Sequence, residues 1–198
     1  KTAARNMLKV TPRHEEEFKK LLSRLQDGSP ALTGNRHFWC SDIMTHHRKD
    51  YYVSARAYSS RTVNTDAPCN QEGLLSHHLA DGCTYIVRNG DEYRGIVPVL
   101  DWQKIPGTTV VQKPKLKGNP RRRGQTAFVG GVSDGTYGAA AFTFYNKPDN
   151  LRARKAWFFF DEAFVCLGAG ITHPSERPVV TTLNQCLLDG PVRWSSCG

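Results

Sequence analysis

This sequence lacks long apolar runs, and its acidic side chains are fewer than its basic ones. No stretch of about 18 consecutive apolar residues occurs in it, so it offers no candidate for a membrane-spanning helix. The first ten residues also lack the apolar region of a secretory signal peptide. Aspartate and glutamate number 18 against 27 lysines and arginines, which gives a formal charge of +9. Such a charge attracts an acidic polymer and gives a neutral partner no electrostatic advantage.

Closely paired cysteines are absent as well. The six cysteines are widely spaced and lack the C-x-x-C pairs of a zinc ribbon. An even number of separated cysteines is typical of proteins from an oxidising compartment, so the sequence predicts a secreted, extracellular protein. Cys69 and Cys83 flank a short excursion, and a disulfide between them would remove loop entropy worth about 3 kcal/mol. The pairing of the other cysteines stays open, and so does the alternative of reduced thiols.

Two adjacent histidine pairs, His46 with His47 and His77 with His78, raise the question of a metal site. Neighbouring side chains in an extended segment point to opposite faces, so neither pair converges on a metal ion. The sequence therefore predicts no metal and no cofactor. Nucleic acid is not favoured as a partner either, because no recognition motif accompanies the positive charge.

The opening segment has the pattern of a single amphipathic helix. Thr11 suits its N-cap, Pro12 suits its first position, and Gly28 is typical of its end. Three glutamates in the first turn favour the positive end of the helix dipole. Apolar side chains follow at helical spacing, namely Phe18, Leu21, Leu22 and Leu25.

The rest of the sequence is typical of a mainly β protein. Short β-branched and aromatic runs alternate with Gly, Pro, Asn and Asp, as in antiparallel sheets. The sequence contains no internal repeat. The number of expected strands predicts a large antiparallel β-sandwich. The predicted strands cover residues 51–58, 83–88, 95–100, 126–132, 138–145, 155–160, 163–168 and 177–183.

A basic loop, residues 113–124, separates two groups of these strands. Proline and glycine in "KPKLKGNPRRRG" oppose regular pairing, so the segment is predicted to be an exposed loop. One interpretation is a solvated charge run. The other is a site for polyanions, since arginine presents a planar fork to carboxylate or sulfate groups. The six candidate binding residues are Lys113, Lys115, Lys117, Arg121, Arg122 and Arg123.

Histidine and tyrosine also lie close together near residue 50. His46, Tyr51 and Tyr52 are candidates for a catalytic base and acid. The alternative is that alternating aromatic residues in a strand serve as packing partners.

Several separated motifs together resemble the central β-domain of polysaccharide lyase family eight, the hyaluronate, chondroitin and xanthan lyases. They are "GNRHFWCSDIMTHHRKDYYVSARAYSSRT", "NQEGLLSHHLADGCTYI", "PVLDWQKIPGTTV", "FVGGVSDGTYGAAAFTFY" and "RKAWFFFDEAFVCLGAGI". The resemblance covers about residues 34–190 and implies a supersandwich, a galactose-mutarotase-like β-sandwich. It implies that residues 1–33 are a helix and linker left from the connection to a helical toroid. Residues 34–198 would be the sandwich domain, cut short at its C-terminal end.

The resemblance also implies a chemistry. Family members cleave a uronic acid polymer by β-elimination, and their toroid supplies the Asn, His, Tyr and Arg of the reaction centre. Glu72 in "NQEG" matches the acidic residue that the β-domain presents to the cleft, where it orients catalytic side chains. Gly73 departs from the family pattern, in which Asn is common, so a neighbouring hydrogen-bonding role is in doubt.

We therefore expect the β-domain of a lyase for an acidic polysaccharide such as a glycosaminoglycan, inactive as this chain alone. Its partners would be the polysaccharide and a helical toroid domain on the same or another chain. The alternatives are a non-enzymatic carbohydrate-binding module derived from the lyase fold, or a structural or adhesive extracellular protein assembled through sheet edges.

Overall fold

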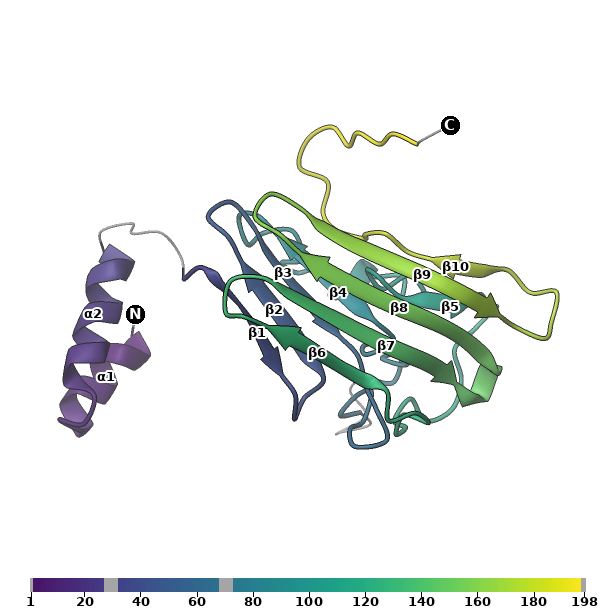
Figure 1. Cartoon of the computed structure of the whole chain (residues 1–198), viewed down its shortest axis with the longest axis horizontal. Helices are drawn as coiled ribbons and strands as arrows, with labels where there is room; N and C mark the ends of the chain where they lie inside the picture. The colour runs from purple at the N-terminus through teal and green to yellow at the C-terminus, as the bar shows by residue number, and fades with distance from the viewer. Residues whose placement is uncertain (1, 27–31, 68–72, 197–198) are drawn as a thin grey trace. The chain divides into compact units, whose positions relative to one another are not determined.

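The computed structural model describes residues 2–26, 32–67 and 73–196. Internal contacts divide the chain into two units, Lys1–Thr33 and Gly34–Gly198. The first unit consists of helices and the second of antiparallel sheets with their connecting loops (Figure 1). In the described ranges, none of the helices has the length and apolar character needed to cross a membrane.

The helical unit contains two α-helices, α1 (Thr2–Val10) and α2 (Glu15–Gln26). The sequence predicted only one, and α2 is that helix, with its three glutamates in the first turn. Thr11 accepts a hydrogen bond from the backbone N–H of Arg13 at 3.2 Å, which satisfies one donor ahead of α2. The prediction of a single helix was wrong, because α1 was missed although Ala4, Met7 and Leu8 lie at helical spacing in it. The predicted end at Gly28 lies outside the described residues.

The second unit contains two four-stranded antiparallel sheets and a two-stranded ribbon, so the predicted mainly β, antiparallel class is confirmed. The first sheet has the order β1 (Gly34–Phe38), β2 (Ile43–His47), β3 (Tyr52–Arg56), β4 (Cys83–Val87). The second has the order β6 (Val129–Ser133), β7 (Gly138–Asn146), β8 (Leu151–Phe159), β9 (Phe164–Thr172). The ribbon pairs β5 (Thr109–Val111) with β10 (Val179–Thr181).

The core forms where the two large sheets face each other (Figure 1). Side chains along β8 alternate between buried and exposed, as expected of a strand with one face on the core. Its buried apolar residues and those of β7 pack against Met44 of β2 and Val53 of β3 in one cluster. This contact holds the two sheets together as a sandwich.

One predicted strand was wrong, and three strands were not predicted. Residues 95–100 contain the short 3₁₀ helix η1 (Val97–Val99), because proline suits its first turn and provides no N–H for a sheet. A second 3₁₀ helix, η2 (Lys147–Asp149), connects β7 to β8. The strands β1, β2 and β5 were missed. Two of them, "GNRHF" and "IMTHH", place a polar residue at a buried position, Asn35 in β1 and His46 in β2, where a strand pattern calls for an apolar one.

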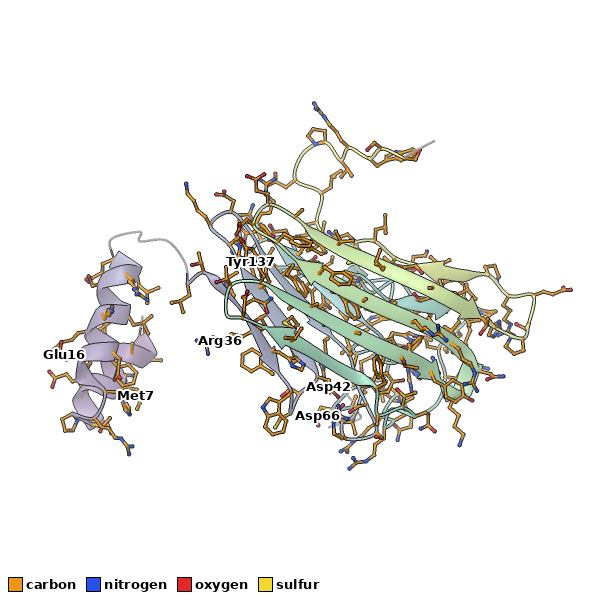
Figure 2. The ribbon with its side chains drawn as sticks, in the orientation of Figure 1. Met7, Glu16, Arg36, Asp42, Asp66 and Tyr137 are labelled. Carbon is orange, nitrogen blue, oxygen red and sulfur yellow. The ribbon has the colours of Figure 1, made fainter. Side chains whose placement is uncertain are left out.

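A buried carboxylate fixes the turn between β1 and β2. Asp42, labelled in Figure 2, is only 4% exposed and has a left-handed φ of 53°. Its oxygens accept hydrogen bonds from Ser59 Oγ at 2.7 Å, Thr62 Oγ1 at 2.6 Å and Arg61 Nη2 at 3.0 Å. The motif "SSRT" (59–62) therefore folds back onto this turn and satisfies the charge.

Strand β9 differs from the other strands in its exposure. It is hydrogen-bonded to β8 on one side, and every residue from Val165 to Thr172 is exposed. Among the described residues, it is the terminal strand of its sheet. It therefore presents an open edge.

A lysine is buried among the inward-facing residues of β8. Lys155 is 7% exposed, and its ammonium group donates hydrogen bonds to the backbone carbonyls of Asp81 and Gly107. Gly82, with a left-handed φ of 82°, leaves room for it, because a Cβ there would lie 2.9 Å from Lys155 Cδ. Burial lowers the pKa of Lys155 to about 8, although Asp81 opposes the shift. The lysine thus ties β8 to two loops of the other layer.

Lys155 predicts a dependence of stability on pH. Its folded pKa lies below the unfolded value of about 10.4, so the unfolded chain binds more protons between these two values. The free energy of unfolding attributable to Lys155 therefore rises by about 3 kcal/mol from pH 8 to pH 10.5. Lys155→Met should lack this rise. Urea unfolding of both proteins across that range measures it.

The comparison has to be a difference between the two proteins, because burial also raises the pKa of Cys83 to about 12 and that of Tyr58. Those two groups reduce stability at high pH in both proteins, and the difference removes the part of their effect that does not depend on the Lys155 charge, which itself lowers the pKa of Cys83. Parallel pH profiles of the two proteins would contradict the assignment.

Candidate functional site

The structure separates the six cations of the basic loop (residues 113–124) into two groups. Exposed side chains belong to Lys115, Lys117, Arg121 and Arg123. Lys113 and Arg122 are half-buried and engaged with carboxylates of the sandwich. Four cations are therefore exposed, whereas the other two pair with carboxylates of the sandwich.

Lys113 is fixed at the start of the basic loop. Its ammonium group forms an ion pair with the Asp149 carboxylate of η2. Its backbone N–H donates to Gln103 Oε1 at 2.7 Å, and Gln103 Nε2 donates to its carbonyl at 2.8 Å. These contacts explain how a segment rich in proline and glycine leaves β5 in a defined direction.

Arg122 is fixed more firmly, near the other end of the loop. Its Nη2 donates to both carboxylate oxygens of Asp81 at 3.1 Å, and its Nε donates to Tyr58 Oη at 3.3 Å. Its guanidinium carbon also lies 5.7 Å from the centre of the Tyr58 ring. Asp81 itself is fully buried and accepts a third hydrogen bond from His78 Nδ1 at 2.8 Å. The predicted role of Arg122 as a ligand-binding cation therefore gives way to a contact inside the protein.

The charges around Asp81 shift its pKa. Burial alone would raise the pKa of Asp81, but Arg122, His78 and Lys155 outweigh burial and lower it. The carboxylate is thus ionised where Arg122 reaches it, and a single guanidinium nitrogen, Nη2, donates to both of its oxygens. Because Asp81 neutralises Arg122, this arginine adds little to the field of the loop.

His46, a candidate catalytic residue, has both ring nitrogens engaged. The ring is fully buried in β2, its Nε2 donates to the Phe160 carbonyl at 2.8 Å, and its Nδ1 accepts from Asn35 Nδ2 at 3.3 Å. Burial, together with the charge of Arg48, lowers its pKa. A neutral, enclosed imidazole without a free nitrogen holds the turn after β8 and has no access to a substrate.

Tyr51 shares that turn with His46. Its hydroxyl donates to the carbonyls of Phe160 at 2.8 Å and Ala163 at 3.3 Å, and burial raises its pKa. Tyr52 instead packs on His47, with 4.3 Å between ring centroids. The structure therefore brings His46 and Tyr51 together, but as packing and turn-fixing partners rather than as a base and an acid.

The remaining predicted residues lie partly outside the described ranges of the chain. Glu72 and Cys69 lie outside the described residues. Cys83 is 1% exposed and carries a free thiol, so the predicted disulfide between Cys69 and Cys83 is not formed in this structure. Ile86 of β4 packs against the core cluster, so Cys83, three residues earlier in the strand, points to the other face and is buried there as a small apolar residue. Cys40, Cys166 and Cys186 are also free thiols.

Three buried polar residues that the sequence analysis did not select are central to this region: Tyr58, Asn64 and Asp81. Asn64 Nδ2 donates to the carbonyls of His77 and Pro120, both at 2.9 Å, and its Oδ1 accepts from the Arg122 N–H at 2.7 Å. In the parts of the chain that are placed, no group of three His, Cys, Asp or Glu residues has the arrangement of a metal site. The Asp-Gly dipeptide at 81–82 signalled a turn, but nothing in the sequence linked it to Arg122.

The sequence that forms this sandwich matches a known protein family. Residues 33–196 match the family model of polysaccharide lyase family 8, super-sandwich domain. The chain therefore belongs to polysaccharide lyase family 8, and the predicted family and fold are confirmed.

Individual relatives are lyases of acidic polysaccharides. Chondroitinase-AC of Pedobacter heparinus is 41% identical over 190 residues, which cover 91% of this chain and 26% of that protein. Hyaluronate lyase of Thermasporomyces composti is 35% identical over 161 residues, or 79% of this chain and 21% of that protein. The chain thus spans about a quarter of the length of these relatives.

Solved structures show the same relationship. A chondroitinase AC lyase, solved in complexes with oligosaccharides, superimposes with a TM-score of 0.82 at 38% identity, covering 93% of this chain and 28% of that one. Chondroitin AC lyase of Streptomyces coelicolor A3, in complex with chondroitin sulphate, gives a TM-score of 0.72 at 32% identity, covering 83% and 24%.

The geometry of His46 predicts a structural phenotype. His46→Leu leaves the buried Asn35 amide without its imidazole partner and removes one of the two hydrogen bonds to the Phe160 carbonyl, the other coming from Tyr51, which together costs about 2 kcal/mol of unfolding free energy. Urea denaturation measures the change. His173→Leu, at a histidine outside the core, serves as the matched control and should change stability by less than about 0.5 kcal/mol. Equal stability of the two variants would contradict the role given to His46.

Proposed function

We propose that this chain forms the β-sandwich part of a lyase that degrades an acidic polysaccharide, such as a glycosaminoglycan, by β-elimination. The observation that carries the proposal is the match of residues 33–196 to the super-sandwich domain of the family. The relatives named for chondroitin and hyaluronate support an acidic substrate. The formal charge of +9 suits such a polymer.

Elimination from a uronic acid needs a base for the C5 proton, an acid for the leaving oxygen and a group that neutralises the carboxylate. Neither candidate in the described sandwich is placed to act as the base or the acid, because both ring nitrogens of His46 and the Tyr51 hydroxyl are hydrogen-bonded inside the protein. We therefore infer that the reacting groups come from a helical domain, on the same or another chain. Glu72 is proposed to orient them.

The sandwich would then supply binding. Lys115, Lys117, Arg121 and Arg123 expose four positive charges on one loop, a pattern that suits the regularly spaced acidic groups of a polysaccharide. The same observation favours a second candidate function, a binding module of lyase origin that acts without catalysis. An extracellular location belongs to both proposals, since a polymeric substrate does not pass through a membrane.

The loop assignment is tested by removing its four exposed charges. Replacing Lys115, Lys117, Arg121 and Arg123 with glutamine should weaken binding to chondroitin sulfate about thirtyfold. Four exposed ion pairs contribute about 2 kcal/mol together, and salt screens them. Isothermal titration at several salt concentrations measures the loss.

A matched variant separates this loop from overall charge. Glutamine at Arg5, Lys9, Lys20 and Arg24 on the helices removes the same charge from exposed positions elsewhere. Its affinity should fall less than threefold. Equal losses in the two variants would show that only net charge matters and would remove the basic loop from the proposal.

The catalytic inference is tested with the purified chain. Incubation with hyaluronan or chondroitin sulfate should yield no ultraviolet absorbance from an unsaturated uronate. Separating the reacting groups forfeits about 7–11 kcal/mol of barrier lowering. Chondroitinase-AC of Pedobacter heparinus is the positive control. Activity of this chain that Tyr51→Phe abolishes would overturn the inference. Activity that returns only with an added helical domain would support it.

A further inference from the structure

We propose that Asn64, Asp81 and Arg122 are positioning residues, a buried anchor that holds the basic loop rigid so that its exposed cations meet an acidic polysaccharide already in place. This proposal rests on the proposed function, since it takes that class of ligand. It adds a role for three enclosed residues. Asn64 and Asp81 are fully buried, and the side chain of Arg122 is 15% exposed. None of the three has to touch the ligand.

Arg122 and Asp81 form an enclosed ion pair. Arg122 binds both oxygens of Asp81, and the pair lies among buried groups where water does not compete. Breaking such a pair from one side leaves a buried charge uncompensated, so the two partners stay together. The backbone at residue 122 is therefore fixed by its own side chain.

Asn64 connects two segments of the chain through its side chain. Its amide uses both N–H groups and its oxygen, and its partners lie on two different segments, at Pro120 and Arg122 of the basic loop and at His77. Its backbone N–H also donates to the Arg122 carbonyl at 3.0 Å. A single side chain thus joins the basic loop to the segment that leads into β4.

The exposed cations of the basic loop lie between residues that are held by the sandwich. Lys113 is held by Asp149 and residues 120 and 122 by the anchor, so the exposed Lys115, Lys117 and Arg121 lie on a span tied at both ends. Arg123 follows directly, and its Nη1 donates to the carbonyl of Arg61 at 3.2 Å. Prolines at 114 and 120 restrict the span further.

The anchoring of the basic loop changes the free energy of ligand binding. A loose loop of this length would lose conformational entropy when a ligand ordered it, and that loss would offset the attraction of its charges. An anchored loop has met this cost during folding. Because Asp81 cancels the charge of Arg122, the anchor affects affinity through order and not through direct attraction.

Asn64→Ala is the most informative variant, because Asn64 is uncharged and 0% exposed. Affinity for chondroitin sulfate should fall about tenfold, while the slope of log affinity against log salt stays unchanged because the ligand still meets the same cations. Tryptic cleavage after Lys115, Lys117, Arg121 and Arg123 should accelerate about tenfold. Asn89→Ala, at an exposed asparagine outside the anchor, should change neither quantity.

Arg122→Lys provides a second variant if Asn64→Ala fails to fold. It keeps the net charge but loses the guanidinium, whose nitrogens bond Asp81, Tyr58 and the Pro120 carbonyl at once, so it should reproduce both effects. Near-wild-type affinity in Arg122→Lys together with a reduced salt slope in Arg122→Gln would mean that residue 122 contacts the ligand, which overturns the positioning role.

The outcomes separate this inference from the function on which it rests. Unchanged cleavage of the loop in both variants would overturn the anchor even if polysaccharide binds. Faster cleavage with unchanged affinity would show an anchor that binding does not need, and would also overturn the proposal. Wild-type protein that does not bind chondroitin sulfate or hyaluronan would instead remove the proposed function, whatever the cleavage rates are.

Discussion

Asp81 is fully buried, and three segments of the chain meet at its functional groups. Its carboxylate accepts from Arg122 and His78, while its backbone carbonyl accepts from Lys155 of β8. A carboxylate at this depth costs several kcal/mol unless it is paired and hydrogen-bonded, so the fold depends on bringing these partners to it. The course of the basic loop and the approach of β8 to β4 both follow from that requirement.

The site was only partly predictable, for a physical reason. Composition and the run of arginines showed where the cations lie, but they did not show which would be free. Arg121, Arg122 and Arg123 are equivalent in the sequence, and only Arg122 reaches a carboxylate 41 residues away along the chain. Likewise, His46 and Tyr51 lie close together in the sequence and were candidates for a base and an acid. In the fold, both side chains donate to the carbonyl of Phe160. Contacts between distant segments decide such cases.

The fold was more accessible from the sequence, because periodicity and turn residues are local signals. Strands β3, β4, β7 and β8 carry β-branched or aromatic residues and were predicted near their observed positions. In β2, His46 is buried with its hydrogen bonds and His47 is half-buried against the Tyr52 ring, and a hydrophobic pattern registers neither. In residues 95–100 the apolar content suggested a strand, yet Val97 and Val99 are exposed and proline directs the backbone into a 3₁₀ turn.

The open edge of β9 bears on how this chain behaves in solution. The strand is nine residues long, contains neither a charged residue nor a proline, and so lacks the usual protection against pairing with another sheet. Mutual repulsion between copies that each carry a formal charge of +9 opposes that pairing at low ionic strength. Added salt shortens the range of this repulsion to about 8 Å near physiological strength. Colloidal behaviour is therefore set by two opposed features, a cationic surface that keeps copies apart and a neutral strand that can join them.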